Sequence, residues 1–472
     1  MTDTRTGPSS LVVSCAWIVE PRRPFGYHPL GYQLGRRCAK IGRNATDYGV
    51  LLSASVPAQT SALVPPRFRW AMLALVSLLY ASFGIAIWSL APLVTVISSD
   101  LGLSSSQMGL ILGAWQLVYV WIAYFAGTVV DRLGLRHALT LGIVVVILSL
   151  VLRAMAVDFW SLFLAVALFG LGGSTISTGA PKMAAVWFRG RERGLAAGVY
   201  SMAPIVSGIL VLAATNSVVV PLTGHWRMSF VVYASLVLLA ALAWVGLAKN
   251  APPAQAAPRP FHETTAQPVA RPPSGLGYLL KQRNMRVALL LAFATFFMNH
   301  GLNNWLPTLL SDRGMSLARA GFVASVPSVA GIVGLLLIPM AARHGYRRAT
   351  LALLLLAGAA STIGIGMLSG VPLGVDLAVS GIARNPLVPV LTLVLMDTPG
   401  VGPGRMGAAG GLLFTAGETG GFMGPFLLGL LRDATGTLFS GLVLLTAMST
   451  ALTAFVFLVR EERQTTPRGD AA

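Results

Sequence analysis

The chain has 472 residues, of which 55% are hydrophobic and only 11% are charged. Soluble proteins are about a quarter charged, so this composition excludes an ordinary soluble protein. The formal net charge of +18 would suit a nucleic-acid partner, but its meaning depends on where the basic residues lie.

Residues 1–69 are polar, basic and without regular apolar pattern. Their apolar stretch, LVVSCAWIV, is too short to cross a membrane. We interpret this segment as a basic extension, either disordered or the product of a start codon assigned too far upstream, with a signal peptide as a further alternative. It holds both cysteines, Cys15 and Cys38, and two such residues indicate neither a disulfide framework nor a metal site.

From residue 70 onward, apolar runs of about 20 residues recur, which is the length of helix that crosses a bilayer. Continuous apolar runs in a membrane indicate helices, because each helix satisfies its own backbone hydrogen bonds. The sequence therefore predicts an all-α membrane protein with twelve transmembrane helices. The predicted spans are 70–97, 107–130, 138–157, 159–186, 194–218, 228–248, 286–310, 320–341, 349–369, 372–396, 406–431 and 437–459.

An even number of spans puts both termini on one side of the membrane. If that side is the cytoplasm, the inner segments hold 27 of the 34 Lys and Arg residues, in agreement with the positive-inside rule. The outer loops then hold only four, namely Arg227, Arg313, Arg319 and Arg432. The basic excess is explained by topology, so no nucleic-acid partner is predicted.

The two halves of the chain repeat one another. The stretch SDLGLSSSQMG from Ser99 follows the first span, and its match SDRGMSLARAG from Ser311 follows the seventh. A segment rich in proline and alanine separates the halves, as expected of a linker. The predicted domains are a six-helix bundle over 70–248, a cytoplasmic linker over 249–285, a second six-helix bundle over 286–460 and a tail over 461–472.

A charged motif, G-x3-D-R-x-G-x-R, lies between the second and third predicted spans. It consists of Gly127, Asp131, Arg132, Gly134 and Arg136. A tight turn needs Gly134, because a side chain would restrict the backbone. In this position the motif resembles the signature loop of the major facilitator superfamily. The resemblance covers about residues 70–460 and implies a monomeric secondary transporter built from two six-helix bundles.

By this resemblance, the loop latches the cytoplasmic ends of the two bundles while the outer side is open. The neighbouring arginine-rich loop, WFRGRERG, contributes Arg193. Charges that only set the topology are the alternative, which explains Arg136 but not the Asp-Arg-x-Gly spacing. In the second half, Ala342 stands where the first half has Asp131, which weakens the case for symmetric gating.

Ionisable side chains within a span are costly and mark functional candidates. Arg384 lies near the middle of the tenth span, beside the helix-breaking Asn385 and Pro386. Its guanidinium suits a carboxylate or a small oxyanion, and the alternative is a structural partner for a carboxylate on another helix. Arg153, near the outer edge of the third span, and Lys182, near the inner end of the fourth, are expected to snorkel to the membrane surface.

We assign Glu418 as the only acid within a span and as the candidate for proton coupling. Burial favours the neutral form of a carboxyl group, whereas a nearby arginine favours the charged form. Such a group can load and release a proton during transport. A permanent ion pair with Arg384 or Lys182 is the alternative.

Four polar side chains gather at the end of the seventh span, in FFMNHGLNNWLPTLL. They are Asn299, His300, Asn303 and Asn304. Residues three and four apart share a helix face, so we predict that this face contacts substrate or a gate, with hydrogen bonds between helices as the alternative. Tyr80, Trp115 and Tyr119 are further candidates for a cavity wall, with core or interfacial packing as the alternative.

The sequence thus predicts a bacterial inner-membrane transporter that moves a small anion, a carboxylate or small oxyanion, with protons by alternating access. The piece PKMAAVWFRGRERGLAAGVY resembles the cyanate, nitrate/nitrite and organic-anion branches of the superfamily. A multidrug efflux antiporter is the first alternative, but it needs early acidic residues, and spans one to six contain none. A transporter-like sensor is the second. No enzyme activity, metal or cofactor is predicted, and the expected partners are substrate, protons and lipids.

Overall fold

The computed structural model describes residues 68–249, 276–342, 346–398 and 401–459. Every regular element in these ranges is helical, and eleven helical segments are long and apolar enough to cross a membrane by length and composition. These findings confirm the predicted all-α membrane fold. Most of the predicted N-terminal extension, with Cys15 and Cys38, lies outside the described residues, as do most of the linker and the C-terminal tail.

The first half of the chain forms seven α-helices with two short irregular turns. They are α2 (Phe68–Trp88), the 3₁₀ turn η1 (Ala91–Leu93), α3 (Val94–Leu101), α4 (Ser105–Ala154), α5 (Phe159–Trp187), α6 (Gly190–Ala214), the π-helical turn η2 (Thr215–Val219), α7 (Val220–Thr223) and α8 (Trp226–Leu247). The second and third predicted spans both lie in α4, which is interrupted by a kink.

The second half continues in the same way. Its helices are α10 (Leu276–Lys281), α11 (Arg283–Asp312), α12 (Leu317–Ala341), α13 (Arg347–Met367), α14 (Gly370–Arg384), α15 (Leu387–Met396), α16 (Gly402–Thr435) and α17 (Phe439–Val456). The eleventh predicted span lies in α16. At 34 residues this helix is long enough to cross a bilayer, but it is glycine-rich and is not among the eleven apolar segments.

The helices are interrupted at three places where the sequence contains proline or glycine. The first span ends its α-helix at Trp88 and passes through η1, which contains Pro92, into α3. Gly134 turns the chain within α4 with φ 76° and ψ 159°, a conformation that L side chains rarely adopt. The tenth span breaks between α14 and α15 at Asn385 and Pro386, where the sequence predicted it.

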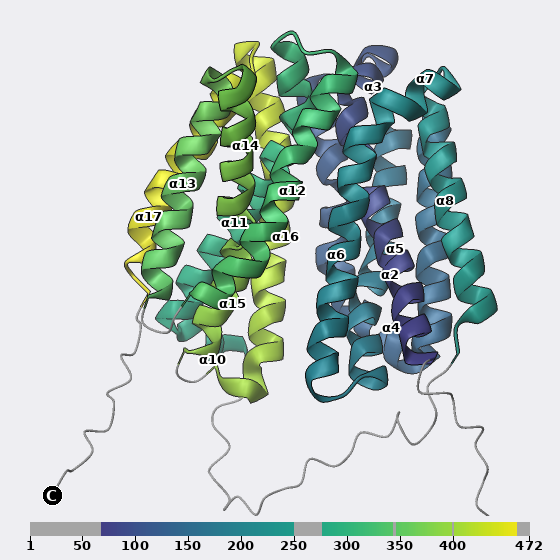
Figure 1. Cartoon of the computed structure of the whole chain (residues 1–472), viewed down its shortest axis with the longest axis vertical. Helices are drawn as coiled ribbons and strands as arrows, with labels where there is room; N and C mark the ends of the chain where they lie inside the picture. Colours follow the sequence, from purple (N-terminus) through teal and green to yellow (C-terminus); the bar gives the residue numbers. More distant parts are fainter. Residues whose placement is uncertain (1–67, 250–275, 343–345, 399–400, 460–472) are drawn as a thin grey trace, which may run out of the picture. The chain divides into compact units, whose positions relative to one another are not determined.

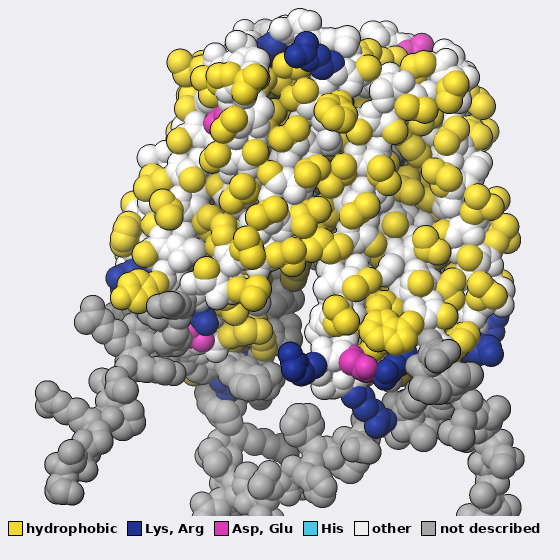
Figure 2. All heavy atoms as spheres, viewed as in Figure 1, with side chains coloured by type: hydrophobic (Ala, Val, Ile, Leu, Met, Phe, Trp, Pro, Cys, Tyr) yellow, Lys and Arg dark blue, Asp and Glu magenta, His cyan; other side chains and the backbone are white. Residues whose placement is uncertain are grey.

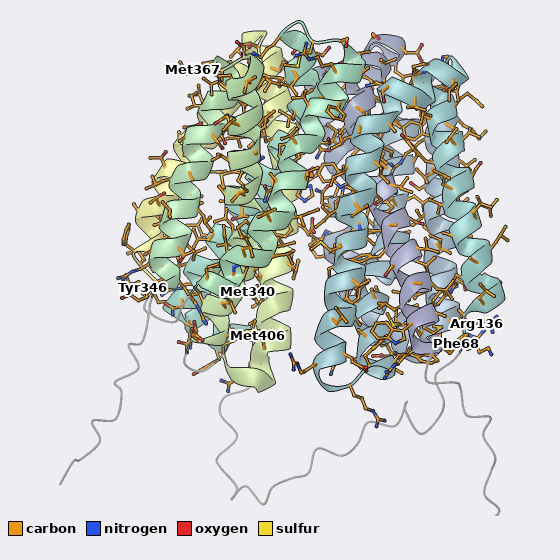
Figure 3. The ribbon with its side chains drawn as sticks, in the orientation of Figure 1. Phe68, Arg136, Met340, Tyr346, Met367 and Met406 are labelled. Carbon is orange, nitrogen blue, oxygen red and sulfur yellow. The ribbon has the colours of Figure 1, made fainter. Side chains whose placement is uncertain are left out.

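The described helices form two groups that contact each other (Figure 1). Helices α2 to α8 make up the first group, and α11 to α17 make up the second. Across the boundary, α4 packs against α16 and α6 packs against α12. Figure 3 labels Phe68, Arg136 and Tyr346 near one end of the helices and Met367 near the other. We call these the Phe68 end and the Met367 end.

The sides of both groups are covered by apolar side chains, as Figure 2 shows for one face. Large exposed apolar residues include Trp121, Leu222 and Met340, which are 73%, 81% and 84% exposed. In the same view, Lys and Arg gather mainly near the Phe68 end, at the bottom. An apolar flank with charges confined to the ends suits a protein surrounded by lipid.

Candidate functional site

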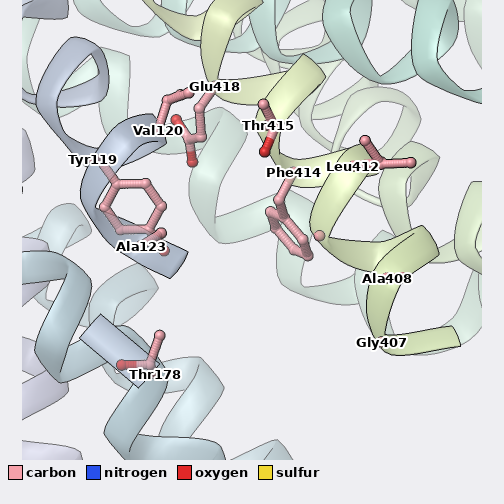
Figure 4. A pocket seen from close by; sticks show the side chains of 11 residues that line it. Tyr119, Val120, Ala123, Thr178, Gly407, Ala408, Leu412, Phe414, Thr415 and Glu418 are labelled. Atoms are coloured by element: carbon pink, nitrogen blue, oxygen red, sulfur yellow. The ribbon is translucent and has the colours of Figure 1, made fainter. Parts of the chain in front are cut away.

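A cavity of about 600 Å³ lies between the two groups of helices. Its polar lining comes from Tyr119 on α4, Thr178 on α5, and Thr415 and Glu418 on α16. Figure 4 shows the side chains of Tyr119 and Thr178 on one side of the space, opposite the α16 residues. The rest of the wall is mostly apolar, and the volume is in the range of small-molecule sites. The cavity is therefore a candidate substrate pathway.

Three polar side chains from three helices meet beside Gly421 of α16, and those of Gln116 and Glu418 are buried. A methyl group built on Gly421 would lie 3.0 Å from Nε2 of Gln116, 3.0 Å from Cδ2 of His300 and 3.4 Å from Oε2 of Glu418. Within the described ranges, Nε2 and Oε1 of Gln116, Nδ1 of His300 and Oε2 of Glu418 have no hydrogen-bond partner. Buried polar atoms almost always have partners in proteins, so this cluster needs one from outside the chain.

The ion pairs that were the alternative role for Glu418 do not form. Lys182 donates instead to Oδ1 of Asp131 at 2.7 Å and to the carbonyl of Val130 at 2.9 Å. Arg384 makes no ion pair with any carboxylate in the part of the chain that the structure describes. Glu418 is thus a buried carboxyl group, 7% exposed, without a cationic partner among those residues.

Arg384 lies at the C-terminal end of α14 and is 3% exposed. Its Nε donates to Oγ of Ser380 at 3.0 Å, and its Nη2 donates to Oδ1 of Asn303 at 3.4 Å. Its Nη1 is buried without a hydrogen-bond partner among the described residues. Asn303 and Asn385 also line a second cavity of about 260 Å³ between the two groups. The guanidinium is therefore joined to that cavity through Asn303.

The other polar residues of α11 have different surroundings. Nδ2 of Asn304 donates to the carbonyl of His300 at 2.8 Å, within its own helix. Oδ1 of Asn299 is buried and has no partner in the described ranges. Of the four predicted residues on α11, His300 therefore belongs to the cluster beside Gly421, and Asn303 belongs to the Arg384 site.

Two of the three predicted aromatic residues lie at the site. The ring of Trp115 is 5.7 Å from that of Tyr119 and 5.9 Å from that of His300, centre to centre. The hydroxyl of Tyr119 lies 2.8 Å from Oγ of Ser177, and its ring lines the larger cavity. Tyr80 instead packs 5.7 Å from the ring of Tyr200 and does not line that cavity.

One assignment from the sequence is wrong. Asp376 lies on α14 about two turns before Arg384, inside the segment Gly370–Met396 that is apolar enough to span. Glu418 is therefore not the only acid within a span. The sequence pattern did not mark Asp376 as a residue within the membrane, because it lies only four residues from the predicted start of the tenth span. Its Oδ2 is buried without a partner among the described residues.

Arg153 does not snorkel to the membrane surface as expected, because its side chain is completely buried. Its Nη1 donates to the carbonyl of Ala86 at 2.6 Å and to Oγ of Ser89 at 3.0 Å. Carbonyl groups in the last turn of a helix lack partners within that helix, and α2 ends at Trp88. Oγ of Ser89 also donates to this carbonyl at 3.1 Å, so Arg153 and Ser89 together satisfy a carbonyl at the break in the first span.

The two groups of helices are closely joined toward the Met367 end. Oδ1 and Oδ2 of Asp433, on α16, accept hydrogen bonds from the backbone N–H groups of Ser105 and Ser106 of α4, both at 2.8 Å. Farther along the same helices, a methyl group on Gly109 would come within 2.4 Å of the carbonyl oxygen of Pro425. The backbones of α4 and α16 are thus in direct contact here.

At the Phe68 end, the observed contacts of the predicted latch residues stay within their own group. Asp131 pairs with Lys182, and Arg136 donates to the carbonyl of Val245 on α8 at 2.7 Å. Four candidates remain. Arg132 and Arg193 are exposed, and a methyl group added to Gly127 or Gly134 would meet nothing within 4 Å. Figure 2 shows a recess between the two groups at this end of the view.

Comparison with known proteins yields one matching family and several relatives. The family described as Major Facilitator Superfamily matches residues 76–425. A hexuronate transporter of Bacillus subtilis (strain 168) is 30% identical over 368 residues, 74% of this chain and 84% of that protein. A quinolone resistance transporter of Acinetobacter baumannii is 31% identical over 195 residues, 40% of this chain and 44% of that protein.

Solved structures resemble the described fold as well. The crystal structure of a bacterial homolog to the human lysosomal transporter Spinster, in an inward-facing and occupied conformation, aligns with a TM-score of 0.65. The alignment covers 83% of this chain and 97% of the homolog's chain, at 16% sequence identity. At this identity, the likeness concerns the fold alone.

Proposed function

This chain belongs to the major facilitator superfamily, and we propose that it moves a small organic anion across a bacterial inner membrane together with protons. The main support for an anionic substrate is Arg384, a buried guanidinium that forms no ion pair with a carboxylate among the described residues. The relative that transports hexuronates, which are sugar carboxylates, supports the same class of substrate.

The environment of Arg384 favours a ligand over a structural role. A buried charge without a direct ion pair is unfavourable. Ser380 and Asn303 offer only neutral oxygens to Arg384, and Asp376, two turns earlier on α14, interacts with it only at longer range. Its free Nη1 and the amide of Asn385, which lines the adjoining cavity, can each donate to a carboxylate. A carboxylate bound there would supply the missing negative charge.

Glu418 is the proposed carrier of the proton. A buried carboxylate without a cationic partner is costly, whereas the protonated form is neutral. The group lines the larger cavity, through which protons can reach it. Import of the anion with a proton would keep the buried site close to neutral in each step.

Access to the site is proposed to alternate between the two ends. Close packing of α4 and α16 near Asp433 supports a closed Met367 end in this conformation. The lower part of the cavity is lined by Gly407 and Ala408, next to Met406, which Figure 3 labels near the Phe68 end. The positive-inside rule makes the Phe68 end cytoplasmic, so this conformation would face the cytoplasm.

The test is a thermal-shift screen of the purified full-length protein with hexuronates, small carboxylates, oxyanions and lipophilic cations. A ligand at 100 times its dissociation constant stabilises the folded state by about 2.7 kcal/mol. We expect hexuronates or related carboxylates to stabilise the wild type but not Arg384→Ala. The control is Arg319→Ala, because Arg319 is exposed at the start of α12, and it should respond like the wild type.

Two outcomes would overturn the proposal. Equal stabilisation of Arg384→Ala and the wild type would make Arg384 structural. Stabilisation by lipophilic cations alone would favour drug efflux, the function named for the quinolone resistance transporter that matches part of this chain.

A further inference from the structure

We propose that Gln116, His300 and Glu418, whose side chains converge beside Gly421, form a subsite for one neutral hydroxyl oxygen. The inference rests on the proposed function and deepens it, because it adds a second recognition point to the anion site at Arg384. The hydroxyl belongs either to the substrate or to a bound water molecule, and the experiment below separates the two.

The three side chains converge beside Gly421. A Cβ built on Gly421 would lie within 3.4 Å of Nε2 of Gln116, the ring carbon Cδ2 of His300 and Oε2 of Glu418, which come from α4, α11 and α16. Gln116 is completely buried and Glu418 is 7% exposed. Both polar atoms of the Gln116 amide are without a partner among the described residues. Leaving even one such atom without a hydrogen bond costs about 1–3 kcal/mol of stability, so these atoms are expected to bind an oxygen atom from a ligand or water.

The donors and acceptors of the subsite match those of a hydroxyl group. The amide of Gln116 offers both donors and an acceptor, and a protonated carboxyl at Glu418 offers the same combination. A hydroxyl group has one donor and two acceptor positions, so it can bond to both at once. An anion would be repelled by Glu418 when that residue is charged. An ammonium group has no acceptor for the amide N–H groups of Gln116.

The subsite is connected to Arg384 through helix α11. His300 belongs to the subsite and Asn303 accepts from Arg384. These residues lie three apart on α11, a rise of about 4.5 Å along the helix. One rigid helix therefore connects the residues that hold the carboxylate with those that hold the hydroxyl. A hydroxylated carboxylate fits this pair of sites better than an unsubstituted one.

The subsite is also divided between the two groups of helices. Gln116 is on α4, whereas His300 and Glu418 are on the other side of the boundary. It is complete only while α4 and α16 are packed against each other at this level. Occupation by a hydroxyl oxygen would therefore stabilise that packed arrangement.

The test adds a methyl group beside the three side chains. Gly421→Ala puts a carbon atom 3.0 Å from the ends of the Gln116 and His300 side chains and so narrows the space between them. The matched control is Gly410→Ala on the same helix, where an added methyl meets nothing within 4 Å. Gln116→Leu is the second variant, since it removes the amide without adding bulk.

Two properties are measured on the full-length protein. The first is the infrared carboxyl band of Glu418, assigned by its loss in Glu418→Gln and recorded without substrate. The second is the dissociation constant for D-glucuronate and for cyclohexanecarboxylate, which is similar in size but carries no hydroxyl groups.

If the hydroxyl belongs to the substrate, Gly421→Ala and Gln116→Leu should bind D-glucuronate roughly tenfold more weakly, which is the effect of one hydrogen bond. Their dissociation constants for cyclohexanecarboxylate should not change. A bound water predicts a shifted infrared band in both variants with both affinities unchanged. If neither the band nor the affinities differ from those of Gly410→Ala, there is no subsite. If the wild type binds no carboxylate, the proposed function fails, and the infrared comparison still decides whether the water site exists.

Discussion

The carboxylate of Asp433 accepts a hydrogen bond from the backbone N–H of Ser105 at 2.8 Å, across the boundary between the two groups of helices. Its other oxygen accepts from Ser106, while Oγ of Ser104 accepts from Gln107 in the same turn. The N-terminal N–H groups of a helix have no partners within it and carry partial positive charge. A residue of α16 therefore completes the cap of α4.

Asp433→Ala should weaken the closure of the Met367 end. Loss of a capping carboxylate costs about 1 kcal/mol, which corresponds to a roughly fivefold change in the ratio of two conformations. The measurement is the distance distribution between spin labels on Thr223 and Thr437, in a background with Cys15→Ser and Cys38→Ser. A longer-distance population should grow in Asp433→Ala, and an unchanged distribution would show that Asp433 does not hold this end closed.

Asp131→Asn should slow transport with little effect on stability or ligand affinity. In this conformation Asp131 pairs only with Lys182, and its side chain is 72% exposed, so the pair is worth less than about 1 kcal/mol. The predicted latch acts in the opposite conformation. Uptake into proteoliposomes should therefore fall several-fold while the dissociation constant stays the same. Lys182→Gln is the control, and an equal loss of transport in it would mean that only their ion pair matters.

Glu418→Gln should separate anion movement from the proton gradient. The amide copies the shape of a protonated carboxyl but cannot release a proton. Exchange of labelled for unlabelled anion across the membrane should persist, whereas accumulation driven by a pH gradient should disappear. Asp376→Asn is the comparison, because Asp376 is the other acid found inside a span. Gradient-driven uptake that survives in Glu418→Gln and vanishes in Asp376→Asn would move the proton site to Asp376.

Arg153→Ala should lower stability by about 1–2 kcal/mol, because it removes two buried hydrogen bonds and leaves a cavity. Part of this loss is offset, because the substitution also removes a buried charge whose Nε and Nη2 have no partner among the described residues. Thermal unfolding in detergent measures the effect. Exposed Arg319→Ala provides the reference and should unfold like the wild type. A variant at Arg153 with unaltered unfolding would show that the break after Trp88 needs no side-chain support.

The sequence was sufficient to predict the spans because their apolar runs are long and continuous. It also located the turn at Gly134 and the break at Asn385, since glycine and proline act locally on the backbone. The site is different, because its geometry depends on contacts between distant helices. Gln116 directly follows Trp115 in an apolar span, and nothing in the sequence around it indicates that it lies close to Glu418.

The surroundings of Arg153 also depend on contacts between helices that the sequence does not reveal. Its position near the end of a span is also typical of a residue that reaches the membrane surface. The decisive feature is the carbonyl of Ala86, 67 residues earlier, which becomes available only because α2 ends at Trp88. A proline at residue 92 was visible in the sequence, but its consequence for Arg153 requires the packing of α2 against α4.

That buried arginine also bears on how the protein is made. The ribosome releases Ala86 and Ser89 well before Arg153, so the groups that receive the guanidinium are already in the membrane when it arrives. Insertion of a segment with a charged side chain is costly unless a partner is available. Synthesis in the opposite order would leave the arginine facing lipid. The direction of translation thus suits the first bundle, and a circular permutant that begins at Leu103, after the first spanning segment Phe68–Leu101, should insert poorly even though the native helix packing remains possible.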